Sequence, residues 1–220
     1  MLSAYVFDAY GTLFDVHAAI GRHRAATGTE ADRLSEIWRT KQLEYTWTLT
    51  LAGHYVDFWM LTERALDFAL ARTPSVDRAI RGKLLEAYLT LNAFPEARPA
   101  LTDLKARGAR LAILSNGSPR MLAAAVEAAG IGGLLETTLS ADTVRCYKPR
   151  PEVYALATDA LALGPSDVGF VSSNRWDVMG AVSFGFKAFW VNRLRQPDEY
   201  ADFAPLREIP SLAALSTLDV

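Results

Sequence analysis

Cysteine and histidine are scarce in this sequence, with one cysteine, Cys146, and three histidines among 220 residues. A single cysteine excludes an intramolecular disulfide, and so few cysteine and histidine side chains exclude a cysteine-rich zinc site. A basic surplus is also missing, because 23 Lys and Arg against 25 Asp and Glu give a net charge of −2. We therefore expect no binding to nucleic acid.

Long apolar runs are absent as well. No segment approaches the roughly 18 uncharged apolar residues of a membrane span, and no basic region of a signal peptide precedes the charge of Asp8. We expect a soluble, cytoplasmic protein that does not associate with membranes. Half of the residues are hydrophobic and 22% are charged, which is typical of a chain that folds around a sizeable core.

Short apolar runs alternate with helical patterns over much of the chain. The runs are brief and apolar on both faces, as buried parallel strands are; they are Leu2–Phe7, Ala109–Leu114, Val168–Val171 and Ala188–Val191. Apolar residues at helical spacing follow in Ala97–Arg107, Pro119–Ala129 and Pro151–Leu161. This alternation predicts an α/β fold, with a parallel sheet between two layers of helices.

One section departs from the alternation. Between Asp15 and Asn92 we find no strand pattern, but three stripes of apolar residues at helical spacing, which begin near Leu34, Tyr55 and Ile80. A block of helices placed directly after the first strand is typical of a cap over a sheet edge. We therefore predict an α/β core domain formed by residues 1–14 and 93–220, and a helical cap domain formed by residues 15–92.

Polar residues follow the predicted strands, at the edge where ligand sites form in open α/β sheets. They are Asp8 to Thr12, Ser115-Asn116-Gly117, Lys148-Pro149 before the next helix, and Ser172 to Asp177. A charge such as Asp8 at the end of an apolar strand is costly to bury without a partner. Taken alone, Asp8 could equally cap a helix, but four polar clusters at strand ends favour an active site.

These four clusters resemble the four motifs of the haloacid dehalogenase superfamily, in order and over essentially the whole chain. More narrowly, Asp8-Ala-Tyr-Gly-Thr-Leu-Phe-Asp15, Trp38-Arg39, Gln42-Leu-Glu-Tyr-Thr-Trp47 and Ser172-Ser-Asn-Arg-Trp-Asp177 resemble the L-2-haloacid dehalogenases. The resemblance implies a Rossmann-like three-layer core with an inserted helical cap. It also implies a homodimer that converts L-2-haloalkanoates to D-2-hydroxyalkanoates and halide.

Two positions separate this sequence from the phosphohydrolases of the superfamily. Those enzymes carry a second aspartate as general acid where this chain has Tyr10, which does not exchange protons near neutral pH without a large pKa shift. They carry a magnesium-binding carboxylate where this chain has Ser173. A halide leaves as a stable anion and needs neither group, so we expect no cofactor and no metal. A phosphohydrolase, or a silent binding module, is the alternative; the retained Asp8, Lys148 and Asp177 oppose the latter.

The remaining polar residues suggest a mechanism. Asp8 attacks the halogen-bearing carbon and forms an ester, and Lys148 keeps Asp8 ionised. Asp177, oriented by Ser172 and Asn174, positions or deprotonates the water that cleaves the ester. We expect Thr12 to hydrogen-bond Asp8, and Ser115 to bind the substrate carboxylate. A plain surface lysine or a helix-capping aspartate are the alternative interpretations of Lys148 and Asp177.

Further residues match the halide and substrate pocket of the family. The resemblance implies that Arg39, from the cap, receives the halide together with Asn116 and Trp176, because a guanidinium stays charged and offers several fixed donors. It implies an apolar pocket of Tyr10, Leu43, Phe58 and Trp176, a substrate contact at Ala9, and Tyr154 hydrogen-bonded near Arg39 and Asp8. Arg39 could instead be an exposed helical arginine, and Phe58 a plain core residue.

Two residues depart from the pattern of the L-2-haloacid dehalogenases. Thr40 stands where glutamine is usual, and Arg175 stands inside the fourth motif where a small residue is common. We expect Arg175 either to point to solvent or to tighten binding of the carboxylate. His17, His23 and His54 lie in the predicted cap, outside the motifs, and we assign them no catalytic role. The preferred halogen, chain length and physiological substrate do not follow from the sequence.

Overall fold

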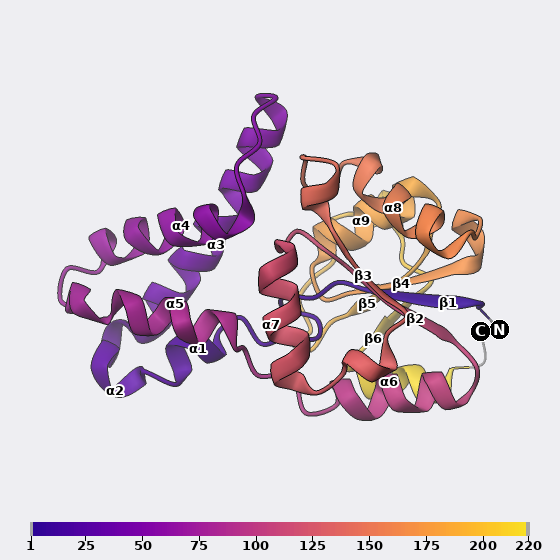
Figure 1. Ribbon diagram of the computed structural model, residues 1–220, viewed down its shortest axis with the longest axis horizontal. Coiled ribbons are helices and arrows are strands. Elements are labelled where there is room, and N and C mark those ends of the chain that lie inside the picture. The colour runs from indigo at the N-terminus through magenta and orange to yellow at the C-terminus, as the bar shows by residue number, and fades with distance from the viewer. Residues whose placement is uncertain (1, 219–220) are drawn as a thin grey trace.

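The computed structural model describes residues 2–218, which contain one sheet of six parallel strands in the order β3-β2-β1-β4-β5-β6 (Figure 1). The strands are β1 (Ala4–Phe7), β2 (Arg110–Ser115), β3 (Thr137–Ser140), β4 (Val168–Ser172), β5 (Lys187–Val191) and β6 (Arg207–Ile209). The four predicted strands are confirmed. The edge strands β3 and β6 escaped prediction because they are short and only partly buried, so neither has the apolar run of a central strand.

Helices cover both faces of the sheet, as predicted. Helices α8 (Pro151–Leu161) and α9 (Arg175–Phe184) contact each other on one face, and α6 (Ala97–Ala106) lies with the C-terminal 3-10 helix η7 (Leu212–Thr217) on the other (Figure 1). Helix α7 (Pro119–Ala129) contacts β3. These crossovers leave the carboxyl ends of β1, β2 and β4 side by side, which is where α/β proteins place their sites.

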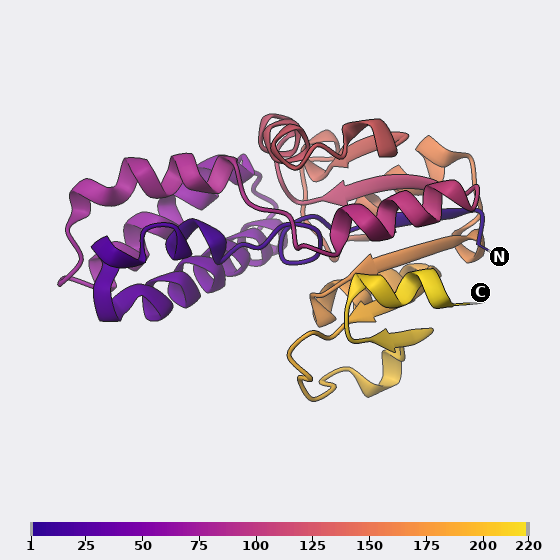
Figure 2. The same cartoon turned by 90° about the horizontal axis from the view of Figure 1, so that it is seen from below.

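The inserted segment forms a separate helical block beside the sheet. It contains α1 (Ala18–Gly21), α2 (Arg24–Thr27), α3 (Ala31–Leu51), α4 (Phe58–Arg72) and α5 (Arg81–Leu89), and Figure 2 shows these helices to one side of the core. The chain enters and leaves the block through two adjacent segments, because Asp15 N donates to Asn92 O at 2.9 Å and Phe94 N donates to Leu13 O at 2.9 Å. We propose this crossing as the boundary between core and cap.

Buried polar contacts fix how α3 lies against its neighbours. Trp38 Nε1 donates to Thr62 O at 2.9 Å, and Gln42 Nε2 donates to Thr62 Oγ1 at 2.7 Å, both across the interface with α4. Tyr88 OH, from α5, donates to Gln42 Oε1 at 3.1 Å. A buried polar group that loses its partner costs about 1 to 3 kcal/mol, so these bonds set the rotation of α3 and thereby the direction of Arg39.

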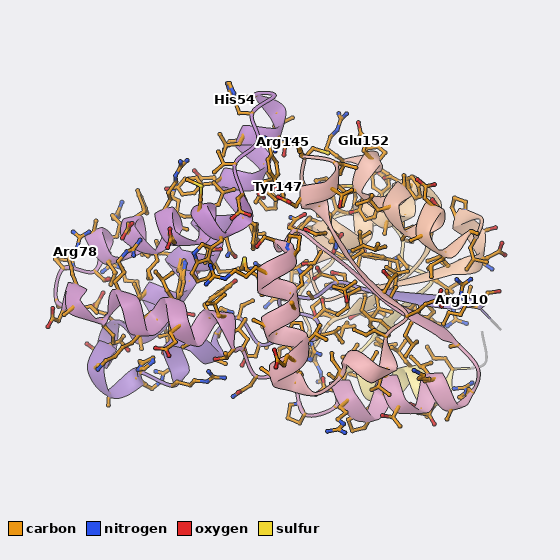
Figure 3. The ribbon with its side chains drawn as sticks, viewed as in Figure 1. His54, Arg78, Arg110, Arg145, Tyr147 and Glu152 are labelled. Atoms are coloured by element: carbon orange, nitrogen blue, oxygen red, sulfur yellow. The ribbon has the colours of Figure 1, made fainter. Side chains whose placement is uncertain are left out.

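The far end of the α3–α4 pair also contacts the core. Tyr55 OH donates to Asp142, and Tyr147 OH donates to Val56 O at 2.5 Å. The Arg145 guanidinium lies 4.8 Å from the centre of the Tyr55 ring. Arg145 and Tyr147, which face the α3–α4 arm in Figure 3, belong to the loop that carries Lys148. The cap is therefore tied to the loop that supplies one of the predicted catalytic residues.

Candidate active site

The predicted site residues converge at the carboxyl edge of the sheet. Asp8 directly follows β1, Ser115 ends β2 and Ser172 ends β4, and β1 lies between the other two strands. Lys148 comes from the loop that precedes α8, and Asp177 from the first turn of α9. Five side chains from distant parts of the sequence thus meet because parallel strands present their C-terminal ends on one side.

Asp8 lies at the centre of this cluster and is only 6% exposed. Its Oδ2 atom accepts hydrogen bonds from Thr12 Oγ1 at 2.9 Å, Asn174 Nδ2 at 2.8 Å and Ser172 Oγ at 3.4 Å. Its Oδ1 atom accepts one from Lys148 Nζ at 3.2 Å. Four donors make burial of a carboxylate tolerable, and they fix one oxygen more tightly than the other.

Lys148 lies between two carboxylates. Its side chain is 1% exposed, and Nζ donates to Asp8 Oδ1 and, at 2.9 Å, to Asp177 Oδ2. The backbone N–H of Lys148 donates to Asn116 Oδ1 at 3.0 Å, so a residue of the second motif holds the lysine loop in place. A surface position for Lys148 is therefore excluded, and its charge compensates two buried anions.

Asp177 is fully buried, and its contacts differ from those we predicted. We expected Ser172 and Asn174 to orient it, but both donate to Asp8 instead. Asp177 is held by Lys148 and by Tyr154 OH, which donates to Oδ1 at 2.8 Å. The Tyr154 hydroxyl thus lies near Asp8 through its bond to Asp177, and Lys148 joins the two carboxylates. Burial raises the pKa of Asp177 to about 6, although Lys148 lowers it in part.

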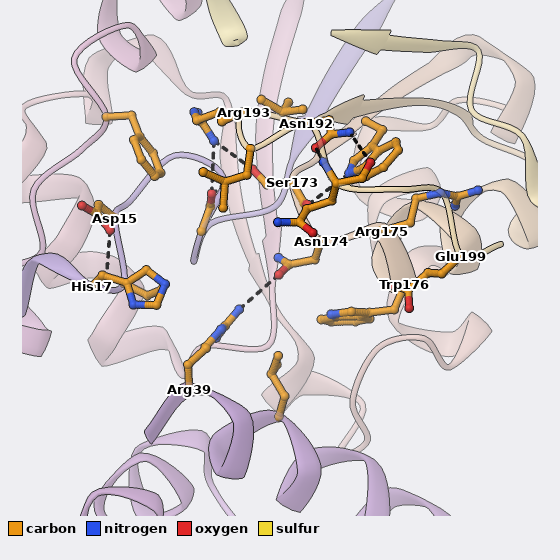
Figure 4. Close-up of a pocket in the computed structure, with 18 of the residues that line it drawn as sticks. Asp15, His17, Arg39, Ser173, Asn174, Arg175, Trp176, Asn192, Arg193 and Glu199 are labelled. Carbon is orange, nitrogen blue, oxygen red and sulfur yellow. Dashed lines mark hydrogen bonds between the residues drawn. The ribbon is translucent and has the colours of Figure 1, made fainter. Parts of the chain in front are cut away.

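Arg39 reaches the core from α3. Its Nη2 atom donates to Tyr10 O at 3.1 Å and lies 3.5 Å from Asn174 Oδ1, while Nη1 donates to Gln42 Oε1 at 2.9 Å. Figure 4 shows the Arg39 side chain directed from the cap helix toward Asn174, with Trp176 beside it. Arg39 therefore links the cap to two residues that contact or adjoin the predicted nucleophile.

Aromatic rings line the site on the cap side. Tyr10 stacks on Tyr88, with ring centres 5.8 Å apart, and lies 6.1 Å from the Phe58 ring. Burial raises the pKa of Tyr10 well above 10, so its hydroxyl stays protonated at neutral pH and does not act as an acid or a base. Gly117 allows the ring this position, because a Cβ atom there would lie 2.5 Å from Tyr10 Cε2.

The other predicted substrate contacts surround these residues. Ser115 Oγ accepts a hydrogen bond from Gly117 N at 3.1 Å, and the Ala9 carbonyl accepts from the Leu13 N–H at 2.9 Å, so both shape the loops next to Asp8. Leu43 and Trp176 border the site from the cap and from α9, and Trp47 lies edge-on to Trp176 with ring centres 5.3 Å apart.

One residue of the site, Arg193, was missed in the sequence. It follows β5 and donates to Gly11 O at 3.2 Å, to Ser173 Oγ at 2.9 Å and to Thr12 O at 2.9 Å. The position after β5 is also a strand end, so the rule that found Asp8 could have found it. Arg193 places a fixed cation beside Ser173, the position at which the phosphohydrolases of the superfamily carry a magnesium-binding carboxylate. Within residues 2–218, no cluster of three or more His, Cys, Asp or Glu side chains is placed to bind a metal.

Arg175 does not point to solvent, so that expectation was wrong, and the hydrogen bonds of its guanidinium are to a neighbouring segment of the core. It is 5% exposed, and its Nε atom donates to Asp198 Oδ1 at 2.7 Å. Its Nη2 atom donates to Tyr200 O at 2.6 Å and to Phe203 O at 3.0 Å. The side chain anchors the segment 198–203 against α9, which sequence alone could not reveal because its partners lie 23 or more residues away.

Arg175→Ala is therefore expected to lower the free energy of unfolding by about 2 to 3 kcal/mol, because two carbonyls and a carboxylate lose a buried partner. Urea denaturation followed by circular dichroism measures this loss. Arg195→Ala, which removes an exposed arginine from the loop just before that segment, is the matched control. Equal stability of the two variants would contradict the anchoring role of Arg175.

Comparison with known proteins agrees with this geometry. A family model of haloacid dehalogenase-like hydrolases matches residues 2–185. (S)-2-haloacid dehalogenase 4A from Burkholderia cepacia is 48% identical over 216 residues, which cover 97% of this chain and 93% of that protein. (S)-2-haloacid dehalogenase 1 from a Pseudomonas species, strain CBS-3, is 48% identical over 99% of this chain and 96% of its own length.

The chain belongs to the haloacid dehalogenase-like hydrolases.

A solved relative supports the same assignment. An L-2-haloacid dehalogenase from Xanthobacter autotrophicus, with chloropropionic acid covalently bound, superimposes with a TM-score of 0.91 at 36% identity, over 99% of this chain and 98% of that one. The predicted superfamily and its capped α/β fold are confirmed by these comparisons. In the part of this haloacid dehalogenase-like hydrolase that the structure describes, no helix has the length and apolar character needed to cross a membrane.

Proposed function

We propose that this hydrolase is an (S)-2-haloacid dehalogenase, which converts L-2-haloalkanoates to D-2-hydroxyalkanoates and halide through an ester on Asp8. The observation that carries the proposal is the environment of Asp8. Its carboxylate is buried, charge-compensated by Lys148 and faced by Tyr10, whose hydroxyl stays neutral. Such a carboxylate suits a nucleophile whose leaving group needs no proton.

In the first step, one Asp8 oxygen attacks the α-carbon of the haloacid from the side opposite the halogen. The new bond is between that oxygen and carbon, and the halide departs with the electron pair of the carbon–halogen bond. Oδ1 is the better nucleophile, because it accepts a single hydrogen bond where Oδ2 accepts three. The covalently bound chloropropionic acid of the Xanthobacter relative supports a covalent route.

In the second step, water attacks the ester carbonyl of Asp8. Asp177, which shares Lys148 with Asp8, accepts one proton from the water, and the oxygen of the departing 2-hydroxyacid takes up the other. Asp177 then releases its proton to the solvent. Asp8 then returns to a carboxylate that carries one oxygen from the solvent. Lys148 and Tyr154 hold Asp177 in place for this transfer.

Halide release with and without a chelator tests this function against a phosphohydrolase of the same fold. With L-2-chloropropionate as substrate, we expect chloride release to be unchanged by EDTA, because Ser173 replaces the magnesium-binding carboxylate and Tyr10 replaces the general acid of the phosphohydrolases. Phosphate release from p-nitrophenyl phosphate is measured in parallel. Activity that EDTA removes and magnesium restores, or phosphate release without chloride release, would contradict the proposal.

Arg39→Lys is expected to reduce turnover of L-2-chloropropionate about 100-fold, because an ammonium cannot replace the planar guanidinium that bonds Tyr10 O and stabilises a departing halide. Steady-state chloride release measures the effect. Arg33→Lys, an exposed arginine on the same helix, is the control. A rate equal to that of the control would contradict a role of Arg39 in halide release.

The homodimer stays a prediction that rests on the resemblance to the family, and the cytoplasmic location stays a prediction from the sequence pattern alone. Gel filtration with light scattering measures the oligomeric state directly. The remaining site roles, including substrate binding at Ala9, Ser115, Asn116, Leu43 and Phe58, are part of this proposal.

A further inference from the structure

A cavity of about 560 Å³ adjoins the active site and extends away from it. Arg39, Leu43, Asn174 and Trp176 belong to both the predicted site and the wall of this cavity. From there the cavity runs to the carboxyl end of β5 (Figure 4). Its volume falls within the range of about 300 to 1,000 Å³ that is usual for ligands larger than a three-carbon acid.

The wall of the cavity is largely apolar away from Arg39. Its apolar residues include Val16, Leu43, Phe94, Val191, Leu194 and Pro197. Charged and polar residues also line it: Asp15, His17, Asn192 and Arg193 are engaged with other protein groups, whereas Gln196 and Glu199 are exposed. Arg193 Nε donates to Glu96 Oε1 at 2.9 Å, its guanidinium lies 3.8 Å from the Phe94 ring centre, and Asn192 Nδ2 donates to Gln196 O at 2.9 Å. Such a wall suits a hydrocarbon chain.

Arg39 separates this cavity from Asp8. Its Nη2 atom bridges Tyr10 O and Asn174 Oδ1, and Asn174 in turn contacts Asp8. The Arg39–Asn174 distance of 3.5 Å is at the limit of a hydrogen bond, so this part of the partition is weak. A turn of Arg39 toward a bound halide or carboxylate would break this contact and open a path from the cavity to Asp8.

We propose that this cavity holds the alkyl chain of 2-haloalkanoates longer than 2-halopropionate, a substrate class that the sequence leaves open. The inference rests on the proposed dehalogenase function. The chain extends from the α-carbon at Asp8, past Arg39 and Trp176, to the apolar wall at Leu194.

A second cavity of about 520 Å³ is the competing location. It lies across Trp176 and is lined by Trp47, Leu51, Tyr147, Lys148 and Met179, among others. A chain that entered it would have to pass Lys148, whose ammonium bonds both Asp8 and Asp177. Moving that ammonium would leave two buried carboxylates without their cation. Arg39 is easier to displace than Lys148, since it is only half-buried and must move in the proposed reaction.

The experiment compares L-2-chloropropionate with L-2-chlorohexanoate, measured as KM and kcat for chloride release. For the wild type we expect a KM about tenfold lower for the hexanoate, because full burial gives at most about fourfold for each of its added methylenes. Two variants test the location. Leu194→Trp narrows the first cavity, and Leu51→Trp narrows the second; both leucines are largely exposed, at 78% and 87%, so both variants should fold.

Leu194→Trp is expected to raise KM for the hexanoate about tenfold more than KM for the propionate, whereas Leu51→Trp leaves the ratio unchanged. Val191→Phe, which fills the first cavity from its buried side, should repeat the effect. If only Leu51→Trp changes the ratio, the chain lies in the second cavity. Equal KM values for the two substrates, or no effect of either filling variant, would also overturn the inference. Absence of chloride release from both substrates would instead contradict the dehalogenase function itself.

Discussion

Asp8→Asn is expected to slow chloride release from L-2-chloropropionate by on the order of 10⁴-fold or more, the loss typical of removing a catalytic nucleophile. An amide is uncharged and a far weaker nucleophile than a carboxylate, while its oxygen can still accept from Lys148 and its NH2 group can donate to the Thr12 hydroxyl. Steady-state kinetics measure the rate, and circular dichroism verifies the fold. Asp202→Asn, at an exposed position outside the site, is the control.

The route of oxygen then tests how Asp8 acts. In a single turnover in oxygen-18 water, we expect the label in the peptide that contains Asp8 and not in the first hydroxyacid formed. Direct attack by water, with Asp8 as a base, also inverts the α-carbon, so the configuration of the product does not distinguish the two routes. Label in the first product, with Asp8 unlabelled, would contradict the ester mechanism.

Asp177→Asn is expected to slow cleavage of the ester by about 10² to 10⁴-fold, the usual contribution of a general base, and to slow its formation much less. An amide cannot accept the proton of the attacking water. The ester on Asp8 should therefore accumulate and appear in intact-protein mass spectra as the added mass of the acid. Tyr154→Phe, which removes one hydrogen bond to Asp177 but not its charge, should give a smaller effect. Equal slowing of both steps by Asp177→Asn would contradict its role as the base.

The pKa of Asp177 adds a pH dependence with a defined sign. Burial raises this pKa from 3.8 to about 6 in the free enzyme, so at lower pH the carboxyl is protonated and cannot accept a proton from water. The rate of ester cleavage should therefore decrease as the pH falls, and the apparent pKa of this decrease should be no higher than about 6. Stability changes in the opposite direction. The folded state binds this proton more tightly than the unfolded chain. The contribution of Asp177 to the free energy of unfolding therefore decreases as the pH rises from about 4 to 6.

The sequence predicted the central strands and the residues at their ends because both follow local rules. A short apolar run followed by Asp8 or Ser172 identifies a strand and the polar group after it, wherever the strand lies in the sheet. The edge strand β6 was not predicted by this rule, because its residues Arg207 and Glu208 are exposed and do not form an apolar run.

The partners of the site residues were harder to predict than the residues themselves. Asn174 and Asp177 are three positions apart at the start of α9, yet one faces Asp8 and the other faces Lys148 and Tyr154. Their directions depend on how α9 is rotated against the sheet, which is decided by tertiary packing. Arg175, between them, turns away to Asp198 for the same reason.

The ammonium of Lys148 also determines when Asp177 is ready to act. In the free enzyme the charge of Asp8 raises the pKa of Asp177 by repulsion, while Lys148 lowers it. An ester on Asp8 carries no charge, so this repulsion ends and the attraction of Lys148 falls on Asp177 alone. The pKa of Asp177 must then drop, so its carboxyl is more fully ionised once the ester has formed than in the free enzyme at the same pH. The apparent pKa for the rate of ester cleavage should consequently be lower than the pKa of Asp177 in the free enzyme. Carbon-13 NMR of the Asp177 carboxyl can measure the latter. One lysine thus serves as the counter-ion of both carboxylates in the free enzyme and of Asp177 alone in the ester.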